Sequence, residues 1–323
     1  MSYAHGSRRA LITGGAGFLG SHLCERLLTM DFEVVCLDNF LTGSAANIAY
    51  LLHDPRFQAI ECNINEVAEI PGEIGLVLHF ASPASPADYL RFPIQTLQAG
   101  SSGTLRALEV ARAKQARFIL ASSSEVYGNP LEHPQRESYW GNVNPIGLRS
   151  VYDEAKRFGE ALTTAYRKEF GVNTAIARIF NTYGPRMRTN DGRAVPTFAR
   201  QAIRGEPVTV TGDGGQTRSF CYVDDTVDGV LMLAQSDYPG PVNIGSQEEL
   251  AISRLATLIT EIVSSRSPVH FVERPADDPE IRCPNTALAN EVLGWSPKIS
   301  LESGLKKTLA WFADQLAAEG QGA

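Results

Sequence analysis

A glycine-rich segment near the N-terminus constrains the fold of this chain more than any other feature. Residues 9–13 form a short apolar run that predicts a buried strand, and residues 21–28 have helical periodicity. Between them, Gly14, Gly17 and Gly20 stand at three-residue intervals. Glycines permit a tight turn and let the backbone approach a pyrophosphate, which the positive N-terminus of the following helix attracts.

An acidic residue follows at about the distance that dinucleotide binding requires. Residues 33–38 predict a second buried strand that ends in Asp38, eighteen residues after Gly20. A carboxylate here can hydrogen-bond the adenosine ribose and would repel a 2′-phosphate. A strand, a glycine turn, a helix, a second strand and a terminal acid rarely follow one another by chance. We therefore predict an NAD site and favour NAD over NADP.

Strand-like and helical segments alternate through the first half of the chain. Further strands are expected over residues 57–62, 76–81, 118–123 and 174–179, and helices over residues 103–113 and 151–170. Such alternation implies right-handed crossovers and an α/β fold with a doubly wound, mostly parallel Rossmann-type sheet. Ligands bind beyond the carboxyl ends of the strands in this architecture.

The second half is less regular and predicts a smaller α/β substrate lobe interwoven with the sheet. Helices are expected over residues 195–205, 224–235, 250–264 and 301–316, and short strands over residues 208–210 and 220–223. Asp224 or Asp225 is expected to cap the helix that starts there. We expect residues 1–180 to form the NAD-binding domain, with residues 219–240 returning to it, and residues 181–218 and 241–323 to form the lobe.

Charge and composition limit the possible functions. The 323 residues carry a net charge of -7, so nothing suggests a nucleic-acid or acidic-membrane partner. No apolar run approaches the length of a membrane-spanning helix, and residues 1–7 lack a signal-peptide core. The five cysteines and six histidines are scattered without metal-ligand spacing. This pattern suits a reducing cytoplasm and predicts no metal site.

Tyr152 and Lys156 stand four residues apart in a predicted helix and therefore face the same way. The ammonium is expected to stabilise phenolate and to lower the tyrosine pKa from about 10. Ser123 ends a predicted strand, where its hydroxyl can bond the substrate oxygen whose proton Tyr152 removes. Serine runs are also common in turns. This serine run, however, follows a predicted strand and precedes Tyr152, and that position favours an active-site role. These residues predict an enzyme that oxidises a hydroxyl by hydride transfer.

The assembled motifs resemble those of the extended short-chain dehydrogenases/reductases that act on nucleotide sugars, above all the UDP-glucuronic acid decarboxylases, or UDP-xylose synthases. The resemblance runs from about Arg9 to Phe312. The glycine loop and the Tyr-Lys pair are common to the superfamily, whereas residues 79–86 (His-Phe-Ala-Ser-Pro-Ala-Ser-Pro) and 139–147 are narrower markers. Residues 122–128, 152–157, 177–187, 190–193 and 216–220 also match.

This resemblance implies an enzyme that oxidises C4 of UDP-glucuronate with NAD, loses carbon dioxide from the resulting β-keto acid, and reduces C4 again to give UDP-xylose. Tyr152, Lys156 and Ser123 would carry out the oxidation, and Glu125 and Arg218 would act around the decarboxylation. A homodimer through two helices per subunit, one bearing Tyr152, is also implied.

The resemblance further implies which residues contact the two ligands. The expected NAD contacts are Gly14, Gly17, Phe18, Leu19, Gly20, Asp38, Asn39, Phe40, Thr42, Gly43, Asn63, Ile64, Ala81, Ser82, Tyr152 and Lys156. The expected substrate contacts are Pro83, Tyr89, Asn181, Arg193, Arg218 and Arg282, with Arg193 and Arg282 as candidates for the diphosphate.

Three other functions stay open, and three positions depart from the family pattern. A nucleotide-sugar 4,6-dehydratase places Asp-Glu where this chain has Ser124-Glu125, a UDP-sugar 4-epimerase needs no carboxylate at Glu125, and a non-catalytic NAD-binding regulator usually lacks the tyrosine. The family commonly has Asp where this chain has Asn63, and it tends toward Lys and Asn at Gln98 and Gly100. Asn63 can still hydrogen-bond near the adenine, but a lost basic residue could weaken hexuronate binding.

Overall fold

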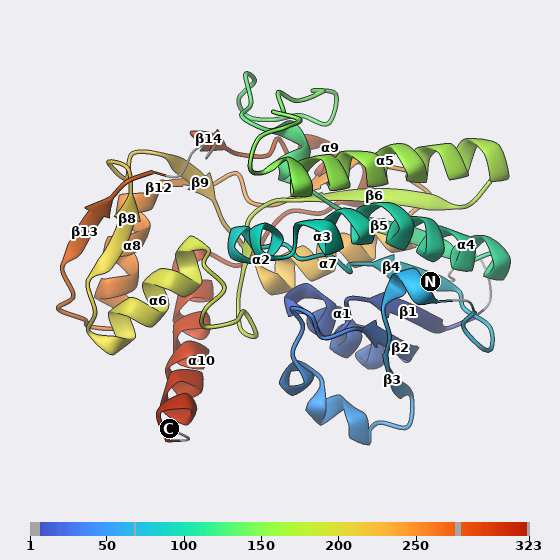
Figure 1. The fold of residues 1–323 in the computed structure, drawn as a ribbon, viewed down its shortest axis with the longest axis horizontal. Coiled ribbons are helices and arrows are strands. Elements are labelled where there is room, and N and C mark those ends of the chain that lie inside the picture. Colours follow the sequence, from blue (N-terminus) through green and yellow to red (C-terminus); the bar gives the residue numbers. More distant parts are fainter. Residues whose placement is uncertain (1–6, 68, 275–278, 322–323) are drawn as a thin grey trace.

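A parallel sheet of seven strands organises the computed structural model, which describes residues 7–67, 69–274 and 279–321 (Figure 1). The strand order is β3-β2-β1-β4-β5-β6-β11, and every neighbouring pair is parallel. The strands are β1 (Arg9–Thr13), β2 (Glu33–Asp38), β3 (Phe57–Glu61), β4 (Leu76–His79), β5 (Arg117–Ser123), β6 (Thr174–Ile179) and β11 (Val242–Ile244). The predicted doubly wound Rossmann-type sheet is therefore confirmed.

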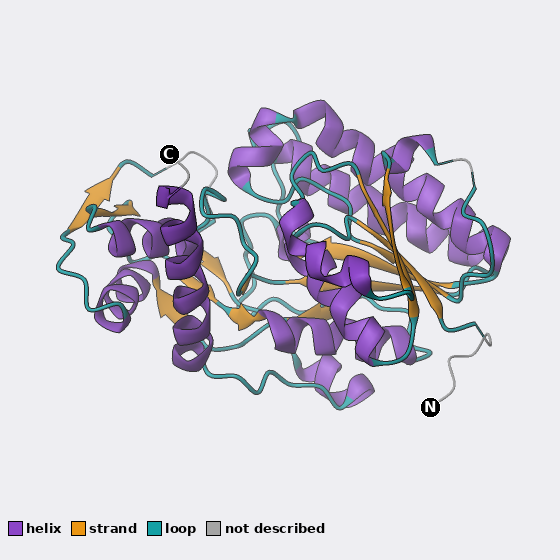
Figure 2. Cartoon of the chain, turned by 90° about the horizontal axis from the view of Figure 1, so that it is seen from below, coloured by secondary structure: helices purple, strands orange, loops and turns teal. Residues whose placement is uncertain are grey.

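Helices cover both faces of this sheet (Figure 2). They are α1 (Phe18–Thr29), α2 (Pro86–Arg91), α3 (Pro93–Gln98), α4 (Thr104–Lys114), α5 (Ser150–Phe170), α7 (Val223–Gln235) and α9 (Ala287–Leu293), with a π-helical turn at Ala99–Gly103 and short 3-10 turns at Ala45–Asn47, Ala49–His53, Ile64–Glu66 and Ser124–Tyr127. The inner strands β1, β4 and β5 are buried on both sides, as expected for a sheet covered twice, whereas the edge strand β3 is partly exposed.

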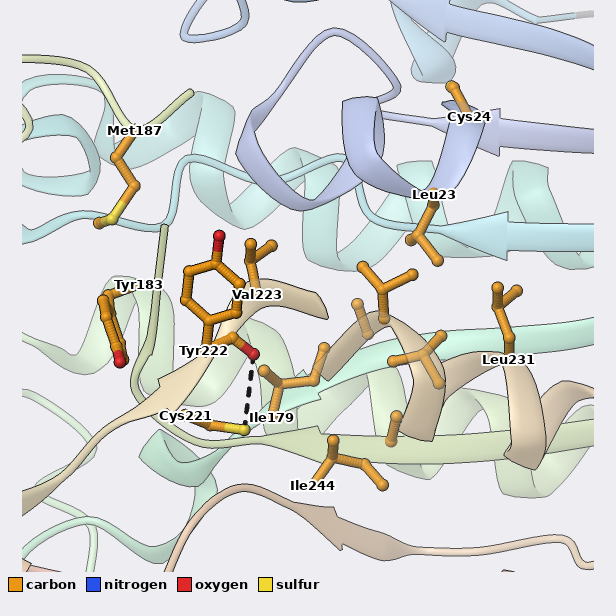
Figure 3. Close-up of a cluster of buried hydrophobic side chains, with 14 of the residues drawn as sticks. Leu23, Cys24, Ile179, Tyr183, Met187, Cys221, Tyr222, Val223, Leu231 and Ile244 are labelled. Carbon is orange, nitrogen blue, oxygen red and sulfur yellow. Dashed lines mark hydrogen bonds between the residues drawn. The ribbon is translucent and has the colours of Figure 1, made fainter. Parts of the chain in front are cut away.

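Successive residues of a strand pack into two separate hydrophobic cores, one on each face of the sheet. Ile12 of β1 and Ile119 of β5 pack on the side of α1 and α7, whereas Leu11 and Phe118 pack on the side of α4 and α5. Figure 3 shows the first core, where Leu23 of α1 and Leu231 of α7 approach residues from β6 and β11. Because side chains alternate along a strand, one sheet supports both layers.

The second lobe, which we expected to bind substrate and still call the substrate lobe, is built from three further helices and several short strands. These are β7 (Thr182–Tyr183), α6 (Ala194–Arg204), β8 (Val208–Thr211), β9 (Thr217–Ser219), β10 (Cys221–Tyr222), β12 (Glu249–Ala251), α8 (Ile252–Ile262), β13 (Val269–Val272), β14 (Ile281–Arg282) and α10 (Leu301–Gln321). The strands form three small sheets, β10-β7, β12-β9-β14 and β13-β8. Helix α6 packs against both α8 and α10 (Figure 1, left).

Two expectations for the second half need revision. Helix α7 begins at Val223, its N-cap is Tyr222 and no side chain caps it, so the capping prediction for Asp224 or Asp225 is wrong. Both carboxylates lie in the first turn instead, where the helix dipole favours them. Strand β11 joins the main sheet, so we propose that the NAD-binding part extends at least to Ile244 rather than to residue 240.

The strand order places a crevice between β1 and β4, whose following helices cover opposite faces of the sheet. Ligands bind at such a switch point, beyond the carboxyl ends of the strands. No helix within the described ranges is both long enough and apolar enough to cross a bilayer.

Candidate active site

A cavity of about 650 Å³ opens at the carboxyl ends of the sheet strands and continues into the substrate lobe. Every predicted catalytic, cofactor-binding and substrate-binding residue except Phe40 lines this cavity. Phe40 has a positive φ of 52° and donates its backbone N–H to the Asp38 carboxylate at 2.8 Å. Phe40 therefore shapes the Asp38 turn, and it does not line the cavity.

The glycine loop packs too closely for side chains. A Cβ on Gly14 would lie 2.7 Å from the Ala81 nitrogen, and one on Gly20 would lie 2.0 Å from the Gly14 carbonyl oxygen. Helix α1 starts directly after Gly17, and no side chain caps it. Its first N–H groups and its dipole are therefore suited to an anion such as a pyrophosphate, so this loop fits the diphosphate of a dinucleotide.

Asp38 lies at the end of β2, where the adenosine ribose of a dinucleotide would be held. Its carboxylate is only 7% exposed and also accepts a hydrogen bond from the Ala16 N–H at 2.9 Å. Burial raises the pKa of Asp38, although the N–H groups of Phe40 and Ala16 act in the opposite direction. Asn63 lies nearby in the same cavity wall, where its Oδ1 accepts from the Asn65 N–H at 3.1 Å.

Tyr152, Lys156 and Ser123 come together as predicted, but the tyrosine pKa does not follow the prediction. Burial raises the pKa of Tyr152 to about 12, and a hydrogen bond with Ser123 only partly offsets this effect. The Lys156 Nζ donates to the Ala121 carbonyl at 2.8 Å and lies 5.4 Å from the Tyr152 ring centre. Burial lowers the pKa of Lys156 to about 8. Desolvation of the buried Tyr152 and Lys156 side chains therefore outweighs the attraction between them, which we expected to lower the tyrosine pKa.

Tyr89 forms the cavity wall beside Tyr152. Its ring stacks on Tyr152 with 5.2 Å between ring centres and 15° between planes. The Tyr89 hydroxyl is buried and has no hydrogen-bond partner among the described atoms. The stack restricts the orientation of the Tyr152 ring, and the free hydroxyl suits the predicted substrate contact.

Glu125 is held between two guanidinium groups. Its two carboxylate oxygens form ion pairs with Arg149 and Arg282, and all three side chains are at most 17% exposed. Burial acts to raise the pKa of Glu125, but Arg282, Arg149 and Arg218 together have the larger effect and lower the pKa to about 2. Glu125 is therefore ionised at neutral pH and acts as an acceptor rather than a proton donor.

The predicted arginines occupy different environments. Arg218 and Arg282 are register partners in β9 and β14, but Arg218 donates to the Thr217, Pro279 and Glu280 carbonyls. Arg193 donates to both oxygens of Asp191. Of these three predicted arginines, Arg282, which we expected near a diphosphate, is the one that forms an ion pair with Glu125.

Arg149, which pairs with Glu125, is a site residue that the sequence did not reveal. It lies three residues before Tyr152, close to one helical turn, and this spacing was the only available signal.

The cavity is positively charged although the chain is acidic overall. Seven basic side chains line it, against four acidic ones. The basic residues are Arg149, Lys156, Arg186, Arg188, Arg193, Arg218 and Arg282, and the acidic ones are Asp38, Asp88, Glu125 and Asp191. A basic cleft in an acidic protein attracts anionic ligands selectively.

This combination of glycine loop, ribose-facing acid, Ser-Tyr-Lys set and basic cavity agrees with the comparison with known proteins. Residues 10–245 match the NAD dependent epimerase/dehydratase family. The chain belongs to this family.

Within the family, the similar relatives include UDP-glucuronic acid decarboxylases. UDP-glucuronic acid decarboxylase 1 of Arabidopsis thaliana is 47% identical over 97% of this chain and 72% of its own length. The Danio rerio protein of the same name is 47% identical over 96% of this chain and 73% of its own length. UDP-glucuronic acid decarboxylase 6 of Arabidopsis thaliana is 48% identical over 92% of this chain and 86% of its own length.

Solved structures of family members share the fold at lower identity. UDP-glucuronic acid 4-epimerase from Bacillus cereus, in complex with UDP-glucuronic acid and NAD, is 28% identical with a TM-score of 0.86, over 95% of this chain and 99% of that chain. DesIV, a dTDP-glucose 4,6-dehydratase from Streptomyces venezuelae with NAD bound, is 25% identical with a TM-score of 0.88, over 96% and 98%. The identity to decarboxylases is therefore clearly higher than to these epimerase and dehydratase structures.

Proposed function

We propose that this protein is a UDP-glucuronate decarboxylase that uses NAD and forms UDP-xylose. One observation carries the proposal: the ionised Glu125, held by Arg149 and Arg282, lies in the same cavity as Ser123, Tyr152 and Lys156. An epimerase needs Ser123, Tyr152 and Lys156 but not the carboxylate of Glu125. The 47% identity to UDP-glucuronic acid decarboxylases supports this choice.

The cavity suits both proposed ligands, NAD and the nucleotide sugar. The glycine loop at Gly14 and Gly20 and the carboxylate of Asp38 would hold NAD, because they leave room for a diphosphate and face a ribose. When bound, NAD would take the hydrogen at C4 with its electron pair and return it at the end. The excess of basic residues in the rest of the cavity favours a nucleotide sugar that carries an additional carboxylate.

Tyr152 would remove the proton of the C4 hydroxyl. Its phenol is protonated at neutral pH in this structure, because its pKa is about 12. It can act as a base only when nearby positive charge stabilises phenolate. Lys156 is suitably close, and Ser123 hydrogen-bonds the phenol and can share the bond to the sugar oxygen.

Oxidation at C4 turns the substrate into a β-keto acid. The bond between C5 and the carboxyl carbon then breaks, and its electron pair moves into an enolate whose oxygen is at C4. The hydroxyls of Tyr152 and Ser123 would hydrogen-bond that oxygen and stabilise the developing charge.

Glu125 would act on the carboxyl side of the sugar. Because its pKa is about 2, it remains a carboxylate. Arg149 and Arg282 hold it in place, and the three side chains together carry one net positive charge, which would attract a substrate carboxylate. A proton must then reach C5, and a water held by this charged group is a suitable donor.

A single incubation tests the reaction. Purified protein with NAD and UDP-glucuronate is expected to release carbon dioxide and to form a UDP-pentose, read by mass spectrometry. A UDP-hexuronate of unchanged mass but inverted C4 would instead identify a 4-epimerase. Conversion of UDP-glucose to a 4-keto-6-deoxy sugar, without pentose from UDP-glucuronate, would identify a 4,6-dehydratase.

We also propose that the protein is a homodimer. Large apolar side chains are exposed along α2, α3, α4 and α5, and α3 and α4 both pack against α5. They are Leu90 (50% exposed), Ile94 (60%), Leu97 (37%), Leu105 (37%) and Phe158 (50%). Sedimentation equilibrium should give twice the chain mass of 35.1 kDa, and a monomer at micromolar concentration would reject this proposal.

A cytoplasmic setting is proposed on the basis of the cysteines. All five are free thiols, and four of them are buried. Free thiols are typical of reducing compartments. A fractionation experiment that placed the protein in an oxidising compartment would exclude this setting.

A further inference from the structure

A loop outside the cavity links the segment that carries Glu125 to the segment that carries Arg282. It starts after Gly128, three residues beyond Glu125, and returns at Asn142, and we call residues 129–141 the linking loop. Its two ends are closed together, because the Asn129 N–H donates to the Asn142 carbonyl at 3.0 Å and the Asn142 N–H donates to the Tyr127 carbonyl at 2.9 Å. Figure 1 shows this green excursion above α5.

Gln135, near the tip of the linking loop, is fully buried. Its backbone N–H donates to the Cys283 carbonyl at 2.9 Å, and its backbone carbonyl accepts from the Asn285 N–H at 2.7 Å. Its side-chain Oε1 accepts from the Cys283 N–H at 2.9 Å, and its Nε2 donates to the Glu132 carbonyl at 2.7 Å. Cys283 directly follows Arg282, so Gln135 fixes the backbone next to that arginine.

Asn243, in β11, also joins the linking loop to the segment that follows Arg282. Its Nδ2 donates to the carbonyls of Gln135 at 3.0 Å and Asn285 at 3.1 Å, and its Oδ1 accepts from the Tyr127 hydroxyl at 2.8 Å. Asn243 is fully buried. One side chain therefore joins the start of the loop, its tip and the segment after Arg282.

Arg282 is consequently held at two points by the linking loop. Its Nη2 donates to the Gly128 carbonyl at 3.1 Å at the start of the loop, and its neighbour Cys283 is bonded to Gln135 near the tip. Its Nη1 pairs with Glu125. The loop therefore determines how the arginine from the substrate lobe meets the carboxylate from the end of β5.

We propose that Gln135 is a positioning residue for decarboxylation, which acts by holding Arg282 against Glu125. This inference rests on the proposed function. Gln135 does not line the cavity, so it acts on the substrate only through Arg282. Tyr152, Ser123 and Lys156 lie on α5 and β5 and are not bonded to the loop tip, so oxidation at C4 should depend far less on Gln135.

Gln135→Met tests the proposal, because methionine has a similar length and lacks both hydrogen-bonding groups. We expect carbon dioxide release in a single turnover to slow by about 100-fold, as for an active-site group displaced by about 1 Å. The rate of C4 oxidation, followed by the absorbance of reduced nicotinamide, and the KM for UDP-glucuronate should change by no more than about threefold. The matched control is Arg136→Gln, which removes an exposed ion pair with Glu132 on the same loop.

Hydrogen exchange provides a readout that does not depend on activity. The Cys283 amide should lose protection in Gln135→Met and keep it in Arg136→Gln, because only the first change removes its acceptor. Gln135→Asn keeps the amide but shortens its reach, so it should show the same selective slowing to a smaller degree.

The outcomes separate this inference from the proposed function. If the natural chain releases no carbon dioxide, the proposed function is wrong. If it does, and Gln135→Met slows both steps equally or neither, the positioning role is wrong. Failure of both Gln135 variants to fold would also overturn it, since Gln135 would then serve stability alone.

Discussion

Burial and nearby charge act in opposite directions on the proposed catalytic residues, and the resulting pKa shift differs from one residue to the next. For Tyr152 burial prevails, and its pKa rises to about 12. For Glu125 the three arginines prevail over burial, and its pKa falls to about 2. The number of charges in contact explains the difference, because Glu125 bonds two guanidinium groups directly while Lys156 bonds a backbone carbonyl rather than Tyr152.

Tyr152→Phe removes the hydroxyl but keeps the ring that stacks on Tyr89. We expect turnover to fall by at least about 100-fold, because general acid–base catalysis is lost, while NAD affinity measured by calorimetry changes little. Tyr166→Phe, on the same helix but bonded to Glu109, is the matched control. Retained turnover with lost NAD binding would contradict the assigned role of Tyr152.

Glu125→Gln keeps a hydrogen-bond acceptor but removes the charge. We expect C4 oxidation to continue and carbon dioxide release to slow by roughly 100-fold. The free energy of unfolding should fall by about 3 kcal/mol, since Arg149 and Arg282 lose their counter-charge. Glu154→Gln, in a more exposed pair with Arg157 on α5, should change stability by less than about 0.5 kcal/mol. Unchanged decarboxylation in Glu125→Gln would remove Glu125 from the mechanism.

Sequence motifs pointed to Tyr152 and Ser123, the family resemblance pointed to Glu125, and all three residues line the cavity. The partners of Glu125 could not be predicted in this way. Arg149 lies 24 residues away and Arg282 lies 157 residues away, and the second contact exists only once the substrate lobe has packed on the sheet. The pKa of Tyr152 was mispredicted for a related reason, since burial is a property of the folded chain.

At the scale of elements, α5 is positioned by its close contact with the π-helical turn at Ala99–Gly103. A Cβ on Gly100 would lie 2.6 Å from the Ala155 Cβ and 2.8 Å from the Ala155 carbonyl oxygen. Ala155 stands between Tyr152 and Lys156 on α5. There is therefore no room at Gly100 for the asparagine to which the family tends. The sequence predicted the helix that follows the π turn, but neither α3 before it nor the π turn itself, whose hydrogen bonds depend on packing.

Gly100→Ala should test this contact. The added methyl group overpacks the junction and is expected to cost about 1–3 kcal/mol in the free energy of unfolding, measured with urea. Activity should fall as well, because α5 carries Tyr152 and Lys156. Adding Ala155→Gly removes one of the clashing atoms and should recover part of both losses. A neutral Gly100→Ala would show that the junction is loosely packed.

In the whole molecule, the sheet and the substrate lobe share one apolar core. The larger core includes Leu23 of α1, Val208 of β8 and Leu305 of α10. The alternating pattern of strands and helices predicted the sheet, because each crossover is a local unit. The return of β11 to the sheet could not be predicted, since three residues carry too little periodicity.

Acid stability is a property of this whole assembly, and His22 contributes to it. Burial lowers the pKa of His22 to about 4, and the charge of Arg186 adds to the effect. The unfolded chain therefore takes up a proton below about pH 6.5 while the folded chain does not, so stability is lost as the pH falls from 6.5 to 4.

His22→Gln removes this proton uptake and keeps a donor for the Pro185 carbonyl. The loss of unfolding free energy between pH 7 and pH 4 should shrink by roughly 3 kcal/mol. His53→Gln, at an exposed position, should leave the profile unchanged. An identical profile for His22→Gln and the natural chain would mean that His22 is not buried in its neutral form.

The most direct test of a transient oxidation at C4 is one incubation with doubly labelled UDP-glucuronate. The substrate carries an isotopic label in the carboxyl carbon and deuterium at C4, and NAD is supplied unlabelled. The account predicts that the carboxyl label appears in carbon dioxide, mole for mole with UDP-xylose, and that deuterium stays at C4 of the product. A product that keeps the carboxyl label, or a pentose formed with its C4 deuterium lost to solvent, would contradict it.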